Sequence, residues 1–163
     1  MTVSLKSGVL LCLAACLLLA CASSFTEPAN SYESTIGEKA ARIALSMVGK
    51  PYRYQGNSPA GFDCSGLVQY SYQAAGLNVP HGTKALREVT LPTDDNLQIG
   101  DLLFFNERGK KYSHVGIYLG GDDFVHAPST GGQVRTENFE DPHWKSSFVE
   151  SRRFMDLSVE KVQ

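Results

Sequence analysis

The sequence predicts an α+β domain in which a helix that carries a cysteine packs on an antiparallel sheet. Asp63 can cap the free N–H groups of a helix, and apolar residues then recur at helical spacing as far as Gly76, which can close the helix. Cys64 is the first residue of that helix. Further along the chain, residues 114–119 and 124–127 have the pattern of two strands. Because only a short glycine-containing turn separates them, we expect these strands to pair as an antiparallel hairpin.

The hairpin carries two histidines. Alternation along the first strand places His114, Gly116 and Tyr118 on one face, and His126 lies on the corresponding face of the second strand. We therefore expect the two imidazoles to be neighbours on one face of the sheet. We also expect the cysteine helix to pack over that face, close to Gly116, which has no side chain to obstruct it.

The remaining elements follow from the same periodicities. Apolar positions on one side predict a helix over residues 36–48, capped by Ser34 or Thr35. A polar loop is expected over residues 106–111, and a loop or short helix over 141–144. The other expected elements are a short helix at residues 83–88 and strands at 102–105, 133–136 and 148–154.

Composition limits the classes of protein that need to be considered. The chain has 163 residues, 42% hydrophobic and 20% charged, which suits a single globular domain with short extensions. The formal net charge is −2, so there is no electrostatic basis for expecting nucleic-acid binding. We expect a monomer without a cofactor.

The N-terminus has the pattern of an export signal. Lys6 supplies a positive charge, and about 12 apolar residues follow it, which is too short a run to span a membrane. The run ends at Cys21, where it resembles a bacterial lipobox, and a polar stretch follows. Cys16 is the alternative lipidation site. An ordinary cleaved signal with incidental cysteines is a further alternative.

These features divide the chain into four parts. Residues 1–21 are expected to be a lipoprotein signal, 22–35 a flexible tether, 36–156 a catalytic domain and 157–163 a tail. If Cys12 and Cys16 leave with the signal and Cys21 takes the lipid, Cys64 is the one cysteine of the folded domain. An unpaired thiol in an exported protein is unusual and favours a chemical role.

A cysteine at a helix start and a histidine on a facing strand suit nucleophilic catalysis. The helix dipole and an imidazolium at His114 are expected to lower the pKa of the Cys64 thiol, while the charge of Asp63 opposes this effect. A zinc site formed by Cys64, His114 and His126 is an alternative, although the spacing of metal-binding motifs is absent. We expect no metal.

Five motifs in order resemble the NlpC/P60 family of cell-wall cysteine peptidases. They are residues 49–54 (GKPYRY), 62–68 (FDCSGLV), 97–105 (LQIGDLLFF), 114–118 (HVGIY) and 124–127 (FVHA). The resemblance implies a papain-like fold with Cys64 as nucleophile, His114 as proton acceptor and His126 orienting it. It also implies that Tyr54 lies beside the thiol, where its hydroxyl can contact the thiolate or an oxyanion; a tyrosine that only packs, with its hydroxyl satisfied elsewhere, is the alternative.

The substrate that the resemblance implies is the stem peptide of bacterial peptidoglycan. The bond that is cut remains open between a γ-D-glutamyl–diamino acid bond and a D-Ala–diamino acid cross-link. Other functions also stay open: a catalytically silent wall-binding module, or a Cys-His amidase or acyltransferase with another substrate. In a Gram-negative source, the anchor places the protein at the periplasmic face of the outer membrane.

One segment departs from the family pattern. A Pro-Arg-Ser/Thr segment followed by a glutamine is common in the family, whereas this chain has His81, Gly82 and Leu86 at the differing positions. If these residues line the substrate groove, specificity differs from that of other members. For His81 itself we expect a surface position.

Overall fold

The computed structural model describes residues 34–93, 96–107 and 109–155. The expected signal, nearly all of the tether and the tail lie outside the described residues. The helices are α1 (Ile36–Ser46), α2 (Cys64–Ala74), α3 (Thr83–Glu88) and α4 (Pro142–Ser147). No helix within the described ranges has both the length and the apolar character needed to cross a membrane.

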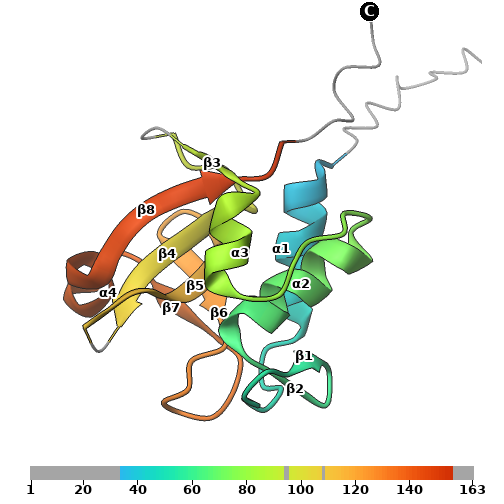
Figure 1. Ribbon diagram of the computed structural model, residues 1–163, viewed down its shortest axis with the longest axis horizontal. Coiled ribbons are helices and arrows are strands. Elements are labelled where there is room, and N and C mark those ends of the chain that lie inside the picture. Colours follow the sequence, from blue (N-terminus) through green and yellow to red (C-terminus); the bar gives the residue numbers. More distant parts are fainter. Residues whose placement is uncertain (1–33, 94–95, 108, 156–163) are drawn as a thin grey trace, which may run out of the picture. The chain divides into compact units, whose positions relative to one another are not determined.

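An antiparallel sheet forms the centre of the domain (Figure 1). Its strand order is β3-β8-β4-β5-β6-β7, and a small separate hairpin joins β1 to β2. The bounds of the strands are β1 Asn57–Ser58, β2 Gly61–Phe62, β3 Leu91–Pro92, β4 Leu102–Glu107, β5 Lys110–Gly120, β6 Asp123–His126, β7 Arg135–Asn138 and β8 Phe148–Arg153. The predicted α+β fold is confirmed.

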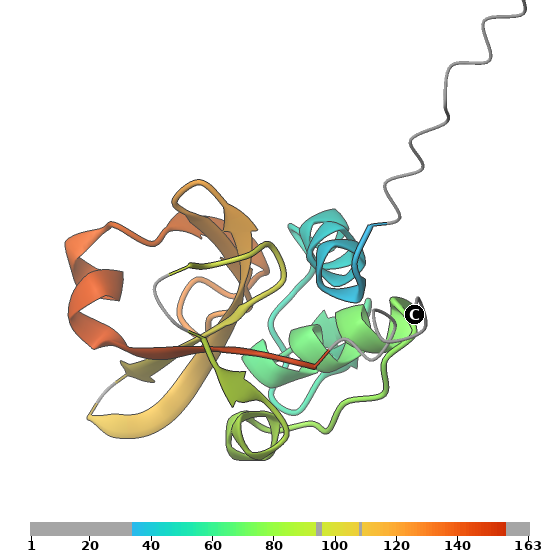
Figure 2. The ribbon, with the colours of Figure 1, turned by 90° about the horizontal axis from the view of Figure 1, so that it is seen from above.

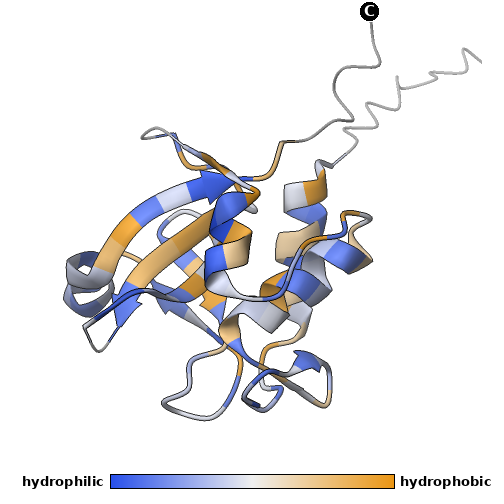
Figure 3. Ribbon diagram, in the orientation of Figure 1, coloured by the Kyte–Doolittle hydropathy of each residue, from blue (hydrophilic) through white to orange (hydrophobic). Residues whose placement is uncertain are grey.

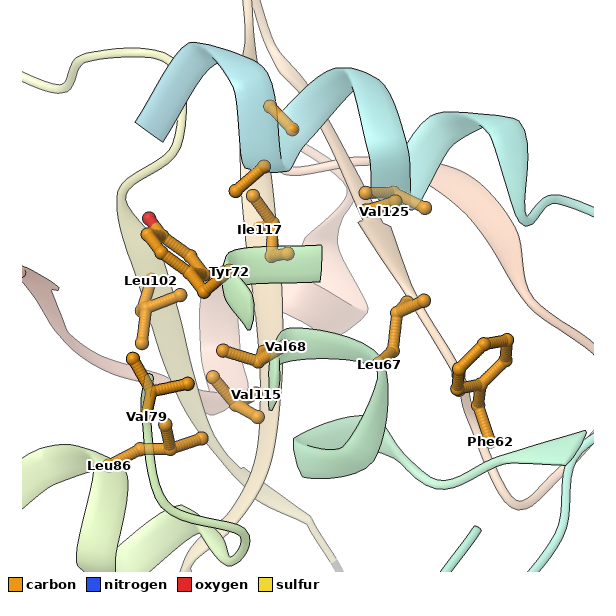
Figure 4. Close-up of a cluster of buried hydrophobic side chains, with 14 of the residues drawn as sticks. Phe62, Leu67, Val68, Tyr72, Val79, Leu86, Leu102, Val115, Ile117 and Val125 are labelled. Carbon is orange, nitrogen blue, oxygen red and sulfur yellow. The ribbon is translucent and has the colours of Figure 1, made fainter. Parts of the chain in front are cut away.

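Helices cover both faces of the sheet. Figure 2 shows α1 and α2 on one side of it and α4 on the other. Between α1, α2 and the sheet lies a large apolar core that includes Leu67, Val68 and Ile117 (Figure 4). The opposite face carries a smaller group, here called the aromatic cluster: Leu103, Phe105, Tyr118, Phe124 and Trp144. Strand β4 is apolar along most of its length because both of its faces are covered (Figure 3).

The predicted helix starts are confirmed. Thr35 caps α1 in a capping box with Glu38, and Asp63 caps α2. The chain leaves α2 through Gly76, whose φ of +104° lies in the left-handed region that glycine tolerates.

Several boundaries differ from the sequence-based expectation. The expected loop over residues 106–111 is a tighter connection, because β4 continues to Glu107 and β5 begins at Lys110. The strand expected at residues 133–136 begins two residues later, since Gln133 pairs with Pro51 in a separate bridge. The two-residue strands β1, β2 and β3 were not predicted, because they are too short to show a periodic pattern.

Candidate active site

Asp63 organises the surroundings of Cys64 at the start of α2. Its Oδ1 atom accepts the backbone N–H of Gly66 at 2.7 Å and the hydroxyl of Ser65 at 3.0 Å. Its Oδ2 atom accepts the backbone N–H of Gln55 at 3.0 Å. These bonds join the helix start to the preceding loop and so fix the position of the thiol.

A close backbone contact also locates this helix start. A Cβ atom at Gly66 would stand 1.9 Å from the carbonyl oxygen of Gly56, so only glycine permits this approach. The same carbonyl accepts the backbone N–H of Asp63 at 2.9 Å. The sequence analysis gave Gly66 no role, because the contact joins residues ten positions apart in an irregular loop.

The two histidines are neighbours on one face of the sheet, as predicted. His114 Nε2 on β5 lies 2.7 Å from Nδ1 of His126 on β6, and both side chains are buried. The Trp144 ring stacks on His114 with 5.7 Å between centroids and meets His126 edge-on at 4.9 Å. The imidazole pair is therefore part of an apolar, water-poor environment.

The element that covers the histidine face differs from the expectation. Val115 and Ile117 point into the core beneath α1 and α2, whereas His114 contacts the aromatic cluster beside α4. A Cβ atom at Gly116 would meet the Phe124 ring at 2.5 Å. The prediction that the cysteine helix packs over the histidines beside Gly116 is therefore wrong. Alternation groups residues by face, but it does not say which helix covers each face.

Cys64 meets β5 through the backbone. Its sulfur accepts the N–H of Val115, which is the residue after His114, and the N–H of Ser65. Within the part of the chain that the structure describes, no hydrogen bond joins the thiol to His114. Catalytic hydrogen bonds are often long in ligand-free sites and tighten when substrate binds. Cys64 therefore contacts β5 at the residue next to His114, with no hydrogen bond between the two side chains.

Burial controls the protonation of all three groups. Burial, followed by the charge of Asp63, raises the pKa of the Cys64 thiol to about 12. Burial and the charge of Arg135 lower the pKa of His114 to about 4. Burial, then His114 and Arg135, lower the pKa of His126 to about 2. The expectation of a lowered thiol pKa is therefore wrong, because desolvation disfavours each charged form. At neutral pH the resting site holds a thiol and a neutral imidazole.

An open groove of about 650 Å³ lies over Cys64. Tyr54 lines it but is 76% exposed, so its side chain stands at the rim. Tyr52 also lines the groove; it is half-buried, packs against the core and pairs with Phe62 in a short bridge. Tyr52 was not predicted to line the groove, because the family resemblance pointed to Tyr54 and local sequence does not distinguish two tyrosines so close together. The role expected for Tyr54 stays a prediction.

The three departures from the family pattern lie in different places. His81 is half-buried in the groove wall, with Nε2 2.9 Å from Asp63 Oδ1, so the expectation of a surface residue is wrong. Gly82 also lines the groove, and its φ of +105° favours glycine before α3. Leu86 is fully buried in the core, so it does not line the groove.

A second cavity, of about 360 Å³, lies on the α4 side of the sheet. Its lining includes Glu107, Arg135, Glu137, His143 and Trp144. Among the residues with a described position, no three or more His, Cys, Asp or Glu side chains are arranged to hold a metal ion. The cavity is charged, and it reaches the side chains that surround the histidine pair.

A helix-start cysteine beside paired histidines on an antiparallel sheet defines the papain-like class of α+β folds. The chain belongs to the NlpC/P60 family, whose sequence model matches residues 49–153.

Named relatives carry the same domain. The murein DD-endopeptidase MepH of Escherichia coli is 35% identical over 128 residues, which cover 72% of this chain and 47% of MepH. The E. coli murein DD-endopeptidase MepS/murein LD-carboxypeptidase is 37% identical over 112 residues, covering 68% and 58%. The chain therefore spans about half the length of these curated relatives. A lipoprotein-like NLP/P60 protein from Staphylococcus aureus superposes with a TM-score of 0.66 at 31% identity, covering 74% of this chain and 41% of that one.

Proposed function

We propose that this protein is a peptidoglycan endopeptidase that uses Cys64 as its nucleophile. The observation that carries the proposal is a capped helix-start cysteine in an open groove, next to a buried histidine pair. Membership of the NlpC/P60 family supports a cell-wall substrate. Two relatives are named murein DD-endopeptidases, which favours a D-Ala–diamino acid cross-link as the bond that is cut.

The reaction starts from the neutral pair. As the Cys64 sulfur attacks the amide carbonyl, His114 takes the thiol proton, so the thiolate forms only during the attack. The backbone N–H of Cys64 at the start of α2 is the candidate donor to the oxyanion that develops. His114 then returns the proton to the leaving amine, and water releases the acyl group from the sulfur.

His126 contributes orientation. The Nε2 atom of His114 lies 2.7 Å from His126 Nδ1. We assign the hydrogen of this bond to His114 Nε2, so that Nδ1 of His114 acts as the base. The buried position of the pair excludes water and stabilises this arrangement. We therefore assign the proton transfer to His114 and not to His126.

The test is digestion of purified muropeptides by the wild-type protein and the Cys64→Ser variant, with products analysed by mass spectrometry. New peptide ends that require Cys64 support the proposal. Release of sugar from peptide would instead indicate an amidase, and binding without any product would indicate a wall-binding module.

We further propose that Cys21 carries a lipid that anchors the exported protein in the cell envelope, at the periplasmic face of the outer membrane if the source is Gram-negative. The support is the lipobox-like sequence and the polar stretch that follows it. Fractionation of cells that express Cys21→Ala tests the proposal: the variant should become soluble. Membrane retention of Cys21→Ala together with its loss in Cys16→Ala would move the anchor to Cys16.

A further inference from the structure

One nitrogen of the histidine pair lacks a partner. His126 is fully buried, and among the described residues its Nε2 atom has no hydrogen-bond partner. Buried polar atoms are nearly always paired, because an unpaired one forfeits its hydrogen bonds to water. This atom is therefore the point at which the catalytic arrangement is incomplete.

The bond between the histidines determines where the hydrogen of His126 must lie. Once His114 has taken the thiol proton, both of its nitrogens carry hydrogen, so its Nε2 must donate to His126 Nδ1. A neutral His126 then carries its own hydrogen on Nε2. The base consequently functions only if His126 is held as the Nε2–H tautomer.

Glu137 is placed to receive that hydrogen. Its Oε1 atom lies 3.9 Å from His126 Nε2. In the register of β6 with β7, Glu137 pairs with Phe124 and Arg135 pairs with His126. Glu137 is therefore the diagonal neighbour of His126, and the two side chains share one face of the sheet.

The Glu137 carboxylate is held in this place by two donors. Arg135 Nε donates to Oε1 at 2.5 Å, and Trp144 Nε1 donates to Oε2 at 3.1 Å. Trp144 also covers both imidazoles, so one side chain shields the pair and anchors the carboxylate. A movement of about 1 Å brings Oε1 within hydrogen-bond distance of His126.

We propose that Glu137 is a positioning residue of the catalytic site. Its carboxylate accepts the Nε2–H of His126, selects the tautomer that His114 needs, and stabilises the positive charge that the pair carries during proton transfer. The catalytic chain then runs from Cys64 through His114 and His126 to Glu137. This inference rests on the proposed function for its kinetic consequence, but the tautomer itself can be measured without turnover.

Other charged groups lie near the histidine pair and also change how readily the pair takes up a proton. Glu107 Oε2 lies 3.9 Å from His114 Nδ1, and His143 Nε2 lies 3.9 Å from Glu107 Oε1. Arg135 acts in the opposite sense, since its charge lowers the pKa of both buried histidines. Without the Glu137 carboxylate, the charge of Arg135 is no longer offset by an adjacent anion, and the protonated pair becomes still less favourable.

The first experiment is independent of activity. Long-range ¹H–¹⁵N spectra of the histidine side chains report the tautomer of His126 in the wild type, Glu137→Gln and Glu137→Ala. We expect the Nε2–H tautomer in the wild type and in Glu137→Gln, whose amide oxygen still accepts, and its loss in Glu137→Ala. An unchanged tautomer in folded Glu137→Ala would overturn the proposal.

The second experiment measures kcat/KM on muropeptides against pH. We expect Glu137→Gln to lower kcat about tenfold, a part of the 10²–10⁴ that a general base contributes, with KM unchanged. The acid limb should move to lower pH in Glu137→Gln and to higher pH in Arg135→Gln, because these substitutions remove opposite charges. Glu140→Gln is the matched control: Glu140 is exposed and pairs with Lys145, so its profile should match the wild type.

Each outcome is decisive. If Glu137→Gln lowers only thermal stability and leaves the acid limb in place, Glu137 is structural and the proposal falls. If the wild type cleaves nothing, the proposed function fails, and the tautomer spectra still decide the position of Glu137.

Discussion

The two sides of strand β5 are built on different principles. On the groove side, polar contacts centred on Asp63 hold Cys64, and the surface is open to a large substrate. On the other side, His114 and His126 are enclosed by the aromatic cluster. The difference follows from what each side must do. Under the proposed function, the nucleophile has to be reached by a polymer, whereas the base has to keep one tautomer and be shielded from water.

The two sides are connected by two adjacent residues of β5. The thiol contacts the N–H of Val115, and the imidazole belongs to His114. Both groups are neutral at rest because burial disfavours their charged forms. Under the proposed mechanism, activity depends on a proton transfer from Cys64 to His114 that substrate binding has to promote, and the two sides can be tested separately.

The largest effect should come from removing the nucleophile. Cys64→Ala should reduce muropeptide cleavage by about 10³-fold or more, since a catalytic unit fails when its nucleophile is lost. The melting temperature should stay near that of the wild type, because the substitution leaves the aromatic cluster intact. Cleavage within tenfold of wild type would show that the groove side does not supply the attacking group.

Tight glycine contacts allow each side to be distorted in turn. Gly66→Ala places a methyl group against the Gly56 carbonyl, and Gly116→Ala places one against the Phe124 ring. Each should lower the free energy of unfolding by about 1–3 kcal/mol, as overpacking does. Urea denaturation measures this loss, and Gly66→Ala alone should also change the alkylation rate of Cys64. If Gly116→Ala changed the alkylation rate of Cys64 as much as Gly66→Ala does, the two sides would not be independent.

Low pH should destabilise the protein through the buried histidines beside the aromatic cluster. Folding lowers the pKa of His114 to about 4 and the pKa of His126 to about 2. In the unfolded chain a histidine has its ordinary pKa of about 6.5, so below that pH the unfolded chain binds more protons than the folded chain. Stability is then fully present above about pH 6.5 and falls as the pH drops towards 4. Melting temperatures across this range test the effect, and His126→Gln should flatten the curve. A curve for this variant parallel to that of the wild type would assign the acid sensitivity to other groups.

A smaller effect concerns the charge beside the thiol. Asp63 raises the pKa of Cys64, so Asp63→Asn should lower it while keeping an oxygen that can cap α2. Iodoacetamide at a fixed, mildly alkaline pH should then alkylate Cys64 faster than in the wild type. Asp123→Asn is the control, since Asp123 is exposed on β6 and does not contribute to the thiol pKa. Slower alkylation of Asp63→Asn would show that the capping geometry outweighs the charge.

The smallest effect should come from His81. Its contact with Asp63 is half-buried, and removing it in His81→Ala should cost about 0.2–1 kcal/mol of stability, as partly exposed ion pairs do. His81→Arg places a permanent cation beside Asp63 and should lose less. Thermal denaturation of both variants tests this order, and equal losses would mean that packing matters more than charge.

The local sequence determined the elements that bear the site. The cap at Asp63, the helix that begins at Cys64 and the histidine hairpin all follow from residues close together in the chain, because caps, turns and periodicity are short-range properties. For the same reason, the pairing of His114 with His126 was predictable from a short turn between two strands.

Tertiary structure decided how these elements face one another. The packing of Phe124 on Gly116, the approach of Gly66 to Gly56 and the bond from His81 to Asp63 join segments whose patterns carry no mutual signal. The carboxylate of Glu137 lies 3.9 Å from His126 only because β7 pairs with β6 in one register. The raised pKa of Cys64 has the same origin, since burial arises from the whole packed domain, whereas the helix start that was expected to lower that pKa is local.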